Sequence, residues 1–427
     1  MSEKLAILGG PKTIFDTFPL YNPYGQEEVL AAKAIVESGV LSRFLGVWHE
    51  DFYGGAKVKE FEKAWEAYFR VNHAISVNSA TSGLIAAIGS LMIEPGDEII
   101  VSPWTMSATA TSILVWNAIP VFADIEPETF NLDPVSVEKN ISPRTKAIVV
   151  PDIFGHAADL DALMAIARKY NLRVIEDAAQ APGALYKDKY VGTVSDIGVF
   201  SLNYHKHIHT GEGGICVTDD ETLAERMQLI RNHAEAVAAG KGVTNLANLI
   251  GFNFRLGEIE SAMGIEQLKK IGTLVERKTI AGLRLTAGLS GLSGLATPVV
   301  KEDCTHVYYV YAMILDDEIL GISRNKIAAA LRAEGVPSLM EGYANLHLLP
   351  MYQRKIAYGN KGFPWSIGDH HSHVSYEKGI CPVAEHLHQN VMMGLLLCMH
   401  DFNDQQVDLV IKAFHKVWGQ LDRLREL

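Results

Sequence analysis

From residue 73 to residue 201, short β-branched apolar runs alternate with longer stretches whose apolar residues recur at helical spacing. In the stretch 159–171, for example, Leu160, Leu163 and Ala167 fall on one side of a helix. Strands that alternate with helices form a mostly parallel sheet covered by helices on both faces. The sequence therefore predicts a doubly wound α/β fold. The expected strands are 73–78, 98–102, 120–124, 146–150, 173–177 and 199–201, and the expected helices are 80–92, 107–116, 134–140 and 159–171.

The 427 residues are enough for two domains. Near residue 265 the alternation gives way to a long helical stretch and then to mixed strands and helices. We therefore expect a large α/β domain at 1–265 and a smaller C-terminal α+β domain at 266–427. Further expected elements are a strand at 307–314 and helices at 221–233, 324–334 and 404–421.

Composition argues against several classes of function. The net charge is −12 and no block of lysine or arginine stands out, so neither nucleic acid nor an anionic membrane is an expected partner. The N-terminal apolar run is too short for a signal peptide, and no stretch approaches the roughly 20 apolar residues of a membrane span. The four cysteines are widely scattered, which indicates a reduced, cytoplasmic protein without disulfides.

Small and polar residues follow several predicted strands, where ligands bind in such sheets. The first strand is followed by residues 79–83, Ser-Ala-Thr-Ser-Gly, at the start of a helix. Free N–H groups there suit a phosphate, although an ordinary helix cap is an equal alternative. Asp177 ends another strand, and a buried carboxylate needs a cationic partner unless it caps a helix. Trp104 follows the second strand and is as consistent with a core position as with a ligand contact.

Lys206 lies between the apolar run 199–200 and a glycine-rich turn at 211–214, which a second strand follows at 215–218. A lysine with constrained backbone on both sides is in the setting that a Schiff-base lysine requires, because its amine must be held and deprotonated. His205, His207 and His209 surround it in sequence. Two alternatives stay open: a solvated lysine in a polar loop, or a metal site made by the three histidines in an extended segment.

The sequence Phe-Ser-x-x-x-x-Lys-x-Ile-x-Thr-Gly-Glu-Gly-Gly at 200–214 resembles the lysine segment of the DegT/DnrJ/EryC1/StrS family of sugar aminotransferases, which use pyridoxal 5'-phosphate (PLP). Three further segments resemble the family in the same order: Ser-Ala-Thr at 79–81, Glu-Asp-Ala-Ala-Gln at 176–180 and Asn-Phe-Arg-Leu at 253–256. The resemblance extends from about residue 15 to the C-terminus. It implies a fold-type-I aminotransferase whose large domain binds PLP, and a homodimer with a shared active site.

The resemblance also implies individual roles. Lys206 would carry PLP, Asp177 would contact the ring nitrogen and Gln180 the ring hydroxyl. The phosphate ligands would be Ala80, Thr81 and Ser201, with Asn253 reaching the phosphate of the neighbouring subunit. The family usually has an aromatic residue over the ring where this chain has Met106, which leaves open whether Met106 or Trp104 covers it. The segment 343–352 resembles a substrate-side segment, so the expected substrate contacts are Trp104, Tyr343 and His347. We expect no metal ligand.

The implied reaction moves an amino group from L-glutamate to a keto or aldehyde sugar, with Lys206 shuttling the proton. Family members act on nucleotide-linked ketosugars, cyclitols and free sugar acids. The segments 103–109 and 204–209 look most like enzymes that aminate C8 of the octulosonic acid Kdo for lipopolysaccharide. A ketosugar dehydratase of the same fold is an alternative, although dehydratase relatives carry histidine where this chain has Lys206. A non-enzymatic metal-binding protein is another. The histidine-rich segment 369–373 has no family counterpart and reads as a polar loop.

Overall fold

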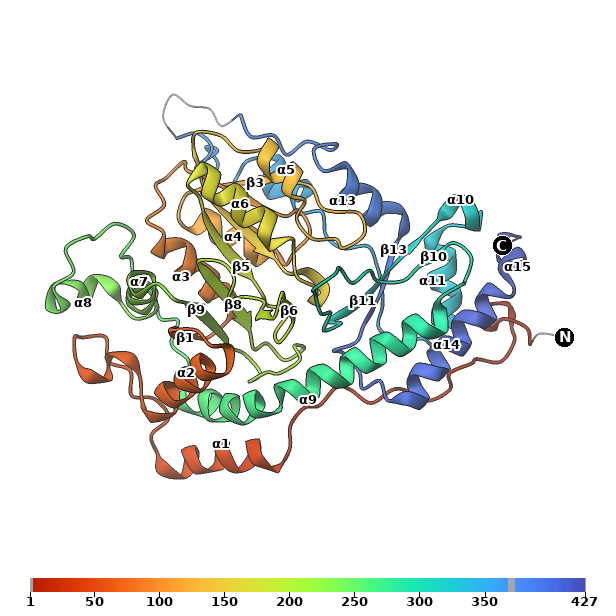
Figure 1. Cartoon of the computed structure of the whole chain (residues 1–427), viewed down its shortest axis with the longest axis horizontal. Coiled ribbons are helices and arrows are strands. Elements are labelled where there is room, and N and C mark those ends of the chain that lie inside the picture. The colour runs from red at the N-terminus through yellow and green to blue at the C-terminus, as the bar shows by residue number, and fades with distance from the viewer. Residues whose placement is uncertain (1–2, 368–372, 427) are drawn as a thin grey trace.

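The computed structural model describes residues 3–367 and 373–426 (Figure 1). Its central sheet has seven strands in the order β1-β9-β8-β5-β4-β2-β3. The strands from β8 to β3 are parallel to one another, whereas β9 runs antiparallel to both of its neighbours, β1 and β8. The strands are β1 (His73–Val77), β2 (Glu98–Val101), β3 (Ile119–Phe122), β4 (Thr145–Pro151), β5 (Arg173–Asp177), β8 (Ile197–Ser201) and β9 (Gly214–Thr218).

Helices cover both faces of this sheet, as adjacent residues of β8 show. Val199 and Phe200 point to opposite faces because successive side chains alternate along a strand. Gly83 of helix α3 lies against Val199, whereas Trp65 and Phe69 of helix α2 contact the Phe200 ring, with centroids 5.3 Å and 4.9 Å away. The predicted doubly wound α/β class is therefore confirmed. The helices of this region are α1 (Gln26–Ser38), α2 (Ala56–Phe69), α3 (Ala80–Ser90), α4 (Ser107–Val115), α5 (Pro134–Lys139), α6 (Leu160–Tyr170), α7 (Glu221–Arg231) and α8 (Ala234–Lys241).

A long helix, α9 (Glu258–Leu289), runs from the central sheet to a second, smaller sheet (Figure 1). Helices α1 and α2 both pack on α9, and α2 also contacts β1 of the central sheet. Helix α14 (Asp404–Trp418) packs beside α9 near the second sheet. The second sheet is antiparallel, in the order β10-β11-β13-β12. Because α9 continues through residue 265 without a break, the boundary placed there stays a prediction.

The remaining elements are short or belong to the C-terminal region. The strands are β6 (Leu185–Tyr186), β7 (Lys189–Tyr190), β10 (Leu295–Ala296), β11 (Val310–Leu315), β12 (Leu339–Glu341) and β13 (Met392–Leu396). The helices are α10 (Asp317–Leu320), α11 (Arg324–Ala333), α12 (Pro350–Gln353), α13 (Pro382–His386) and α15 (Leu421–Arg425). Nowhere in the described ranges does a helix combine the length and the apolar character needed to cross a membrane.

Gly214, the first residue of β9, lets that strand approach the start of α3. A Cβ atom at this position would lie 2.7 Å from the Ala80 amide nitrogen and 2.8 Å from the Ser79 carbonyl carbon, closer than real Cβ contacts allow. The crowded atoms belong to the backbone, so only a displacement of α3 or β9 could make room. The close approach thus fixes where the first turn of α3 lies.

Gly214→Ala is expected to lower the free energy of unfolding by about 1–3 kcal/mol, the usual cost of overpacking. Gly272→Ala is the control, since Gly272 lies inside α9 and its nearest neighbour is the Tyr68 hydroxyl at 4.0 Å. Alanine there is expected to be neutral or to stabilise by up to about 1 kcal/mol. Equilibrium urea unfolding measures both variants. Equal midpoints for Gly214→Ala and the unmodified chain would contradict the assignment.

Candidate active site

One cavity, of about 220 Å³, lies at the carboxyl ends of β1, β5 and β8, as expected for a ligand site in a doubly wound sheet. It brings together residues that are up to 264 positions apart, from Ser79 to Tyr343. Eight of the residues predicted from sequence line it: Ala80, Thr81, Met106, Asp177, Gln180, Ser201, Lys206 and Tyr343.

The start of α3 forms one wall of this cavity. The Ser79 hydroxyl caps the helix by accepting a hydrogen bond from the Ser82 amide at 3.1 Å. The amides of Ala80 and Thr81 have no acceptor within the described chain, and both residues border the cavity. Free N–H groups at a helix N-terminus favour an anion. Ser79 therefore caps the helix, and the free amides of Ala80 and Thr81 leave the anion site as a prediction.

Asp177 contributes a buried carboxyl group at the tip of β5. Its Oδ2 accepts a hydrogen bond from the Thr109 hydroxyl at 2.7 Å, and its Oδ1 accepts one from the Ala179 amide at 3.3 Å. Burial raises the pKa of Asp177, and these hydrogen bonds oppose the shift. Turns follow at 179–180 and 182–183, so Asp177 does not cap a helix. Ionising this carboxyl is favourable when a cation meets it in the cavity.

Gln180 and Tyr343 lie beside the carboxyl. Gln180 Oε1 accepts a hydrogen bond from the Phe154 amide at 2.8 Å, which fixes the orientation of the side-chain amide. Gln180 Nε2 then lies 3.5 Å from the Tyr343 hydroxyl. This pair connects the loop after β5 to the C-terminal region across the cavity.

Lys206 is buried, with its ammonium nitrogen 4.3 Å from the centroid of the Tyr309 ring. Burial lowers the pKa of Lys206 to about 8, and the nearby Asp177 carboxylate opposes the shift. A substantial neutral fraction is therefore present near physiological pH. Because only the neutral amine is a nucleophile, burial prepares Lys206 to attack a carbonyl.

His205, His207 and His209 do not lie on one side of an extended segment. Turns and bends at 204–208 replace the extended segment that a metal site would need. His207 Nε2 lies 2.8 Å from the Val307 carbonyl oxygen, and His209 Nδ1 lies 2.9 Å from the Tyr24 hydroxyl. His205 lines the cavity, and burial lowers its pKa to about 4. Within residues 3–367 and 373–426 no three histidine, cysteine, aspartate or glutamate side chains form a metal-binding group.

Three residues predicted from sequence lie away from the cavity lining. Trp104 is fully buried, donates to Asn345 Oδ1 at 2.7 Å and stacks on Phe130. His347 is buried, with Nε2 3.0 Å from Glu385 Oε1. Asn253 is exposed. Met106, which is 62% exposed, does border the cavity, so it is better placed than Trp104 to cover a bound ring.

The histidine-rich segment 369–373 lies mostly outside the described residues. Its last member, His373, has Nδ1 3.0 Å from Arg144 Nη2.

The sequence did not reveal two residues that contact the central groups of the site, Thr109 beside Asp177 and Tyr309 beside Lys206. Thr109 reads as an ordinary helical residue, and its bond to Asp177 depends on how α4 meets β5. Tyr309 lies in the run Val-Tyr-Tyr-Val-Tyr at 307–311, which predicts a strand in the core. Neither pattern signals a contact with residues about 70 or 100 positions away along the chain.

Comparison with known proteins identifies the family. Residues 46–376 match the model of the DegT/DnrJ/EryC1/StrS aminotransferase family. The spore coat polysaccharide biosynthesis protein SpsC of Bacillus subtilis is 34% identical over 346 residues, which are 80% of this chain and 86% of that protein. GDP-perosamine synthase of Caulobacter vibrioides is 37% identical over 304 residues, covering 70% of this chain and 79% of that enzyme.

The fold comparison agrees. The crystal structure of an aminotransferase from Psychrobacter cryohalolentis matches with a TM-score of 0.81 at 27% identity, covering 95% of this chain and 100% of that one. The family inferred from the four sequence segments is thus confirmed, and this chain belongs to the DegT/DnrJ/EryC1/StrS aminotransferase family.

Proposed function

We propose that this aminotransferase moves an amino group from L-glutamate to a keto or aldehyde carbon of a sugar, with PLP attached to Lys206. The observation that carries this proposal is the convergence of three features on one cavity: a desolvated lysine, a buried carboxyl and a helix N-terminus with free amides. The lysine matches the carbonyl carbon of PLP, the carboxyl matches its ring nitrogen, and the helix N-terminus matches its phosphate.

The residues fit PLP as follows. The free amides of Ala80 and Thr81 and the Ser201 hydroxyl would bind the phosphate. The Asp177 carboxylate would meet the protonated ring nitrogen, which supplies the cation that its burial requires. Gln180 would contact the ring hydroxyl, and Met106 would lie over the ring. Bound PLP supplies an electron sink for negative charge at the α-carbon of the amino donor.

Lys206 then has two tasks. Its neutral amine would hold the cofactor, and the same amine would move a proton to and from the α-carbon of the amino donor. An acid–base group works best when its pKa lies near the operating pH. The pKa of about 8 that burial gives Lys206 meets this condition. Tyr309 and Tyr343 enclose the amine and the carboxyl from the C-terminal side and limit access of water.

The acceptor is proposed to be a sugar used in cell-surface polysaccharides. A nucleotide-linked ketosugar is supported by the 37% identity to GDP-perosamine synthase. Amination at C8 of Kdo is supported only by the resemblance of the segments 103–109 and 204–209 to enzymes that carry out that reaction. The test is an absorption spectrum of the purified protein before and after L-glutamate or L-glutamine, followed by a panel of both sugar types. Conversion of a ketosugar without any amino donor would instead favour the dehydratase alternative.

We also propose a cytoplasmic homodimer with shared active sites. All four cysteines are free, as in a reduced compartment. Apolar side chains are exposed along α1 and the segment after it, which indicates a surface that a second copy covers. These side chains are Val29, Leu30, Val36, Leu41, Val47 and Trp48. Asn253 is exposed and lies away from its own cavity, which is consistent with a role in the site of the partner subunit.

Lys206→Ala is expected to bind PLP without covalent attachment and to lose turnover, because no amine remains to attach the cofactor or to move the proton. Hydride reduction followed by peptide mass spectrometry detects the attachment, and release of 2-oxoglutarate measures turnover. The control is Lys416→Arg, which keeps the charge of a largely covered lysine that pairs with Glu334 in the C-terminal region, outside the cavity lining. Normal transamination by Lys206→Ala would contradict the central assignment.

Asp177→Asn is expected to bind PLP but to slow the half-reaction with glutamate by on the order of 100-fold, about 2.7 kcal/mol. The amide keeps the shape and removes the charge that holds the ring nitrogen protonated. Glu334→Gln is the control, because Glu334 is also buried, accepts from the Ala6 amide at 2.7 Å and lies outside the cavity lining. Stopped-flow absorbance measures the rate of this half-reaction in Asp177→Asn and in the control variant. An unchanged rate in fully loaded Asp177→Asn would mean that another residue contacts the ring nitrogen.

Mixed dimers test the shared site. Lys206→Ala and Asn253→Ala protomers, each inactive alone, are expected to regain roughly half of the wild-type activity per dimer, since one of the two sites recovers both residues. Differently tagged protomers allow mixed dimers to be purified before assay. Inactive mixed dimers would show that Asn253 acts in its own subunit.

A further inference from the structure

Two tyrosines of the N-terminal segment contact the loop that carries Lys206. The Tyr21 hydroxyl donates to the His207 carbonyl oxygen at 2.6 Å. The Tyr24 hydroxyl lies 3.0 Å from the His209 carbonyl oxygen and 2.9 Å from His209 Nδ1. These are the first and third residues after Lys206, so both contacts hold the loop immediately beyond the lysine.

Tyr21 is itself held by Lys278 of α9. The Lys278 ammonium lies 4.0 Å from the centroid of the Tyr21 ring and donates to the carbonyl oxygens of Leu397, at 2.6 Å, and His400, at 3.2 Å. The Tyr21 amide donates to the Met399 carbonyl oxygen at 3.2 Å. A buried ammonium that is bound by carbonyl groups and an aromatic face fixes the position of that ring.

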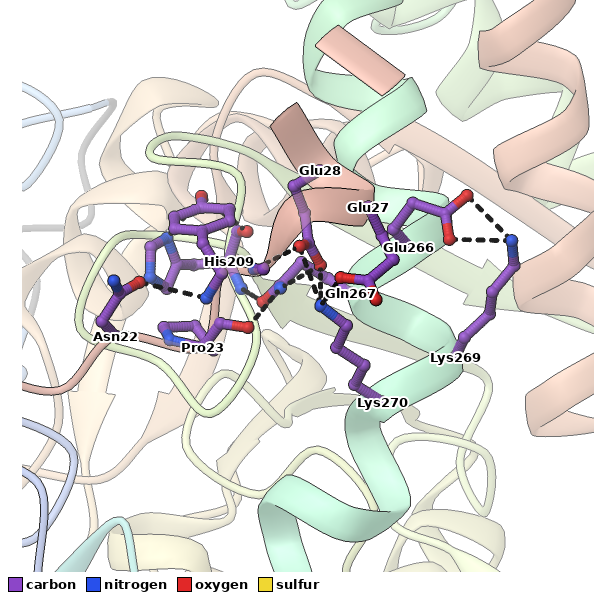
Figure 2. A network of polar contacts seen from close by, with 11 residues as sticks. Asn22, Pro23, Glu27, Glu28, His209, Glu266, Gln267, Lys269 and Lys270 are labelled. Carbon is purple, nitrogen blue, oxygen red and sulfur yellow. Dashed lines mark hydrogen bonds and ion pairs between the residues drawn. The ribbon is translucent and has the colours of Figure 1, made fainter. Parts of the chain in front are cut away.

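Gln267 of α9 fixes the second contact, as Figure 2 shows. Its Oε1 accepts from the His209 amide at 3.2 Å, while its Nε2 donates to the Pro23 carbonyl oxygen at 3.2 Å and to Glu28 Oε1 at 2.8 Å. Lys270 in turn donates to Glu28 Oε2 at 2.8 Å. Gln267 is fully buried, so every polar atom of its side chain is used to join the N-terminal segment, α9 and the lysine loop.

We propose that residues 20–28 form a strap in which Tyr21 and Tyr24 act as positioning residues for Lys206. Both hydroxyls remain neutral donors, since burial raises the pKa of Tyr24 to about 12 and that of Tyr21 further. The strap lies outside the family-matched range 46–376. It keeps the loop closed against α9, and so keeps water away from the amine. This inference rests on the proposed role of Lys206.

The strap also bears on the charge state of Lys206. Asp177 and Cys398 raise the pKa of its amine, and burial lowers it by more. His205, His207 and Tyr309 face the lysine as well, and burial holds the histidines neutral and the tyrosine protonated. Loosening the loop would hydrate the ammonium and move the pKa of Lys206 upward.

The test compares Tyr21→Phe, Tyr24→Phe and the double variant with Tyr358→Phe. Tyr358→Phe is the matched control, because the Tyr358 hydroxyl also donates to a backbone carbonyl oxygen. Its acceptor is Leu114, at 2.8 Å, which lies away from the lysine loop. In the apoprotein, labelling of Lys206 by an amine-reactive reagent is followed against pH by peptide mass spectrometry. The pH at which labelling of Lys206 is half-maximal is expected to rise by roughly one pH unit in the double variant, toward the pKa of ~10.4 of an exposed lysine. It is expected to stay unchanged in the control.

The second readout is the rate at which PLP becomes covalently attached to Lys206, trapped by hydride reduction. We expect a fall of about tenfold in the double variant, because a displaced amine attacks less often in the required geometry. If the double variant does not fold, the two single variants decide the question by the same readouts.

If the strap variants match the control in both readouts, Tyr21 and Tyr24 do not position Lys206, and the proposed function is unaffected. Failure of the wild-type protein to attach PLP at Lys206 would instead overturn the proposed function itself.

Discussion

Burial of an amine and a carboxyl in the same cavity is the constraint on which the site depends. Desolvation disfavours the charge on Lys206 and the charge on Asp177, and each group partly compensates the other. The fold must therefore supply further partners, which are the Thr109 hydroxyl for the carboxyl and the Tyr309 ring face for the amine. In the proposed function the protonated ring nitrogen of PLP would be a further cationic partner for the Asp177 carboxylate.

The sheet topology brings these groups together. β5 and β8 are parallel neighbours, so Asp177 and Ser201 end at the same edge, and β1 places the start of α3 beside them. The insertion of β9 between β1 and β8 has a second effect, because Gly214 sets how closely α3 approaches. The lysine loop connects β8 to β9, so both of its ends join paired strands of the sheet. Tyr309 and Tyr343 of the C-terminal region line another side of the cavity, and the N-terminal segment and α9 contact the lysine loop.

Local patterns gave the element types correctly and their ends less well. The predicted strand 307–314 begins only at Val310, because Tyr308 adopts a left-handed conformation with φ of 50° and breaks the extended run. That break is held by the Val307 amide, which donates to the Gly155 carbonyl oxygen at 2.9 Å. The predicted helix 404–421 ends at Trp418 and a separate turn, α15, follows. In both cases contacts or backbone geometry beyond the periodic pattern decide the boundary.

The sequence by itself determined the α/β class, the family and eight of the residues that line the cavity. The resemblance to the family supplied most of these residues, Tyr343 among them. For those that follow strands of the central sheet there is also a physical reason, because the carboxyl ends of parallel strands lie at one edge of the sheet. Only the tertiary structure decided that the Tyr309 ring faces Lys206 and that the Thr109 hydroxyl donates to Asp177. It also decided that Tyr21 and Tyr24 form hydrogen bonds to the lysine loop. These contacts join segments about 70 to 190 residues apart, and side-chain hydrogen bonds over such separations leave no periodic trace in the chain.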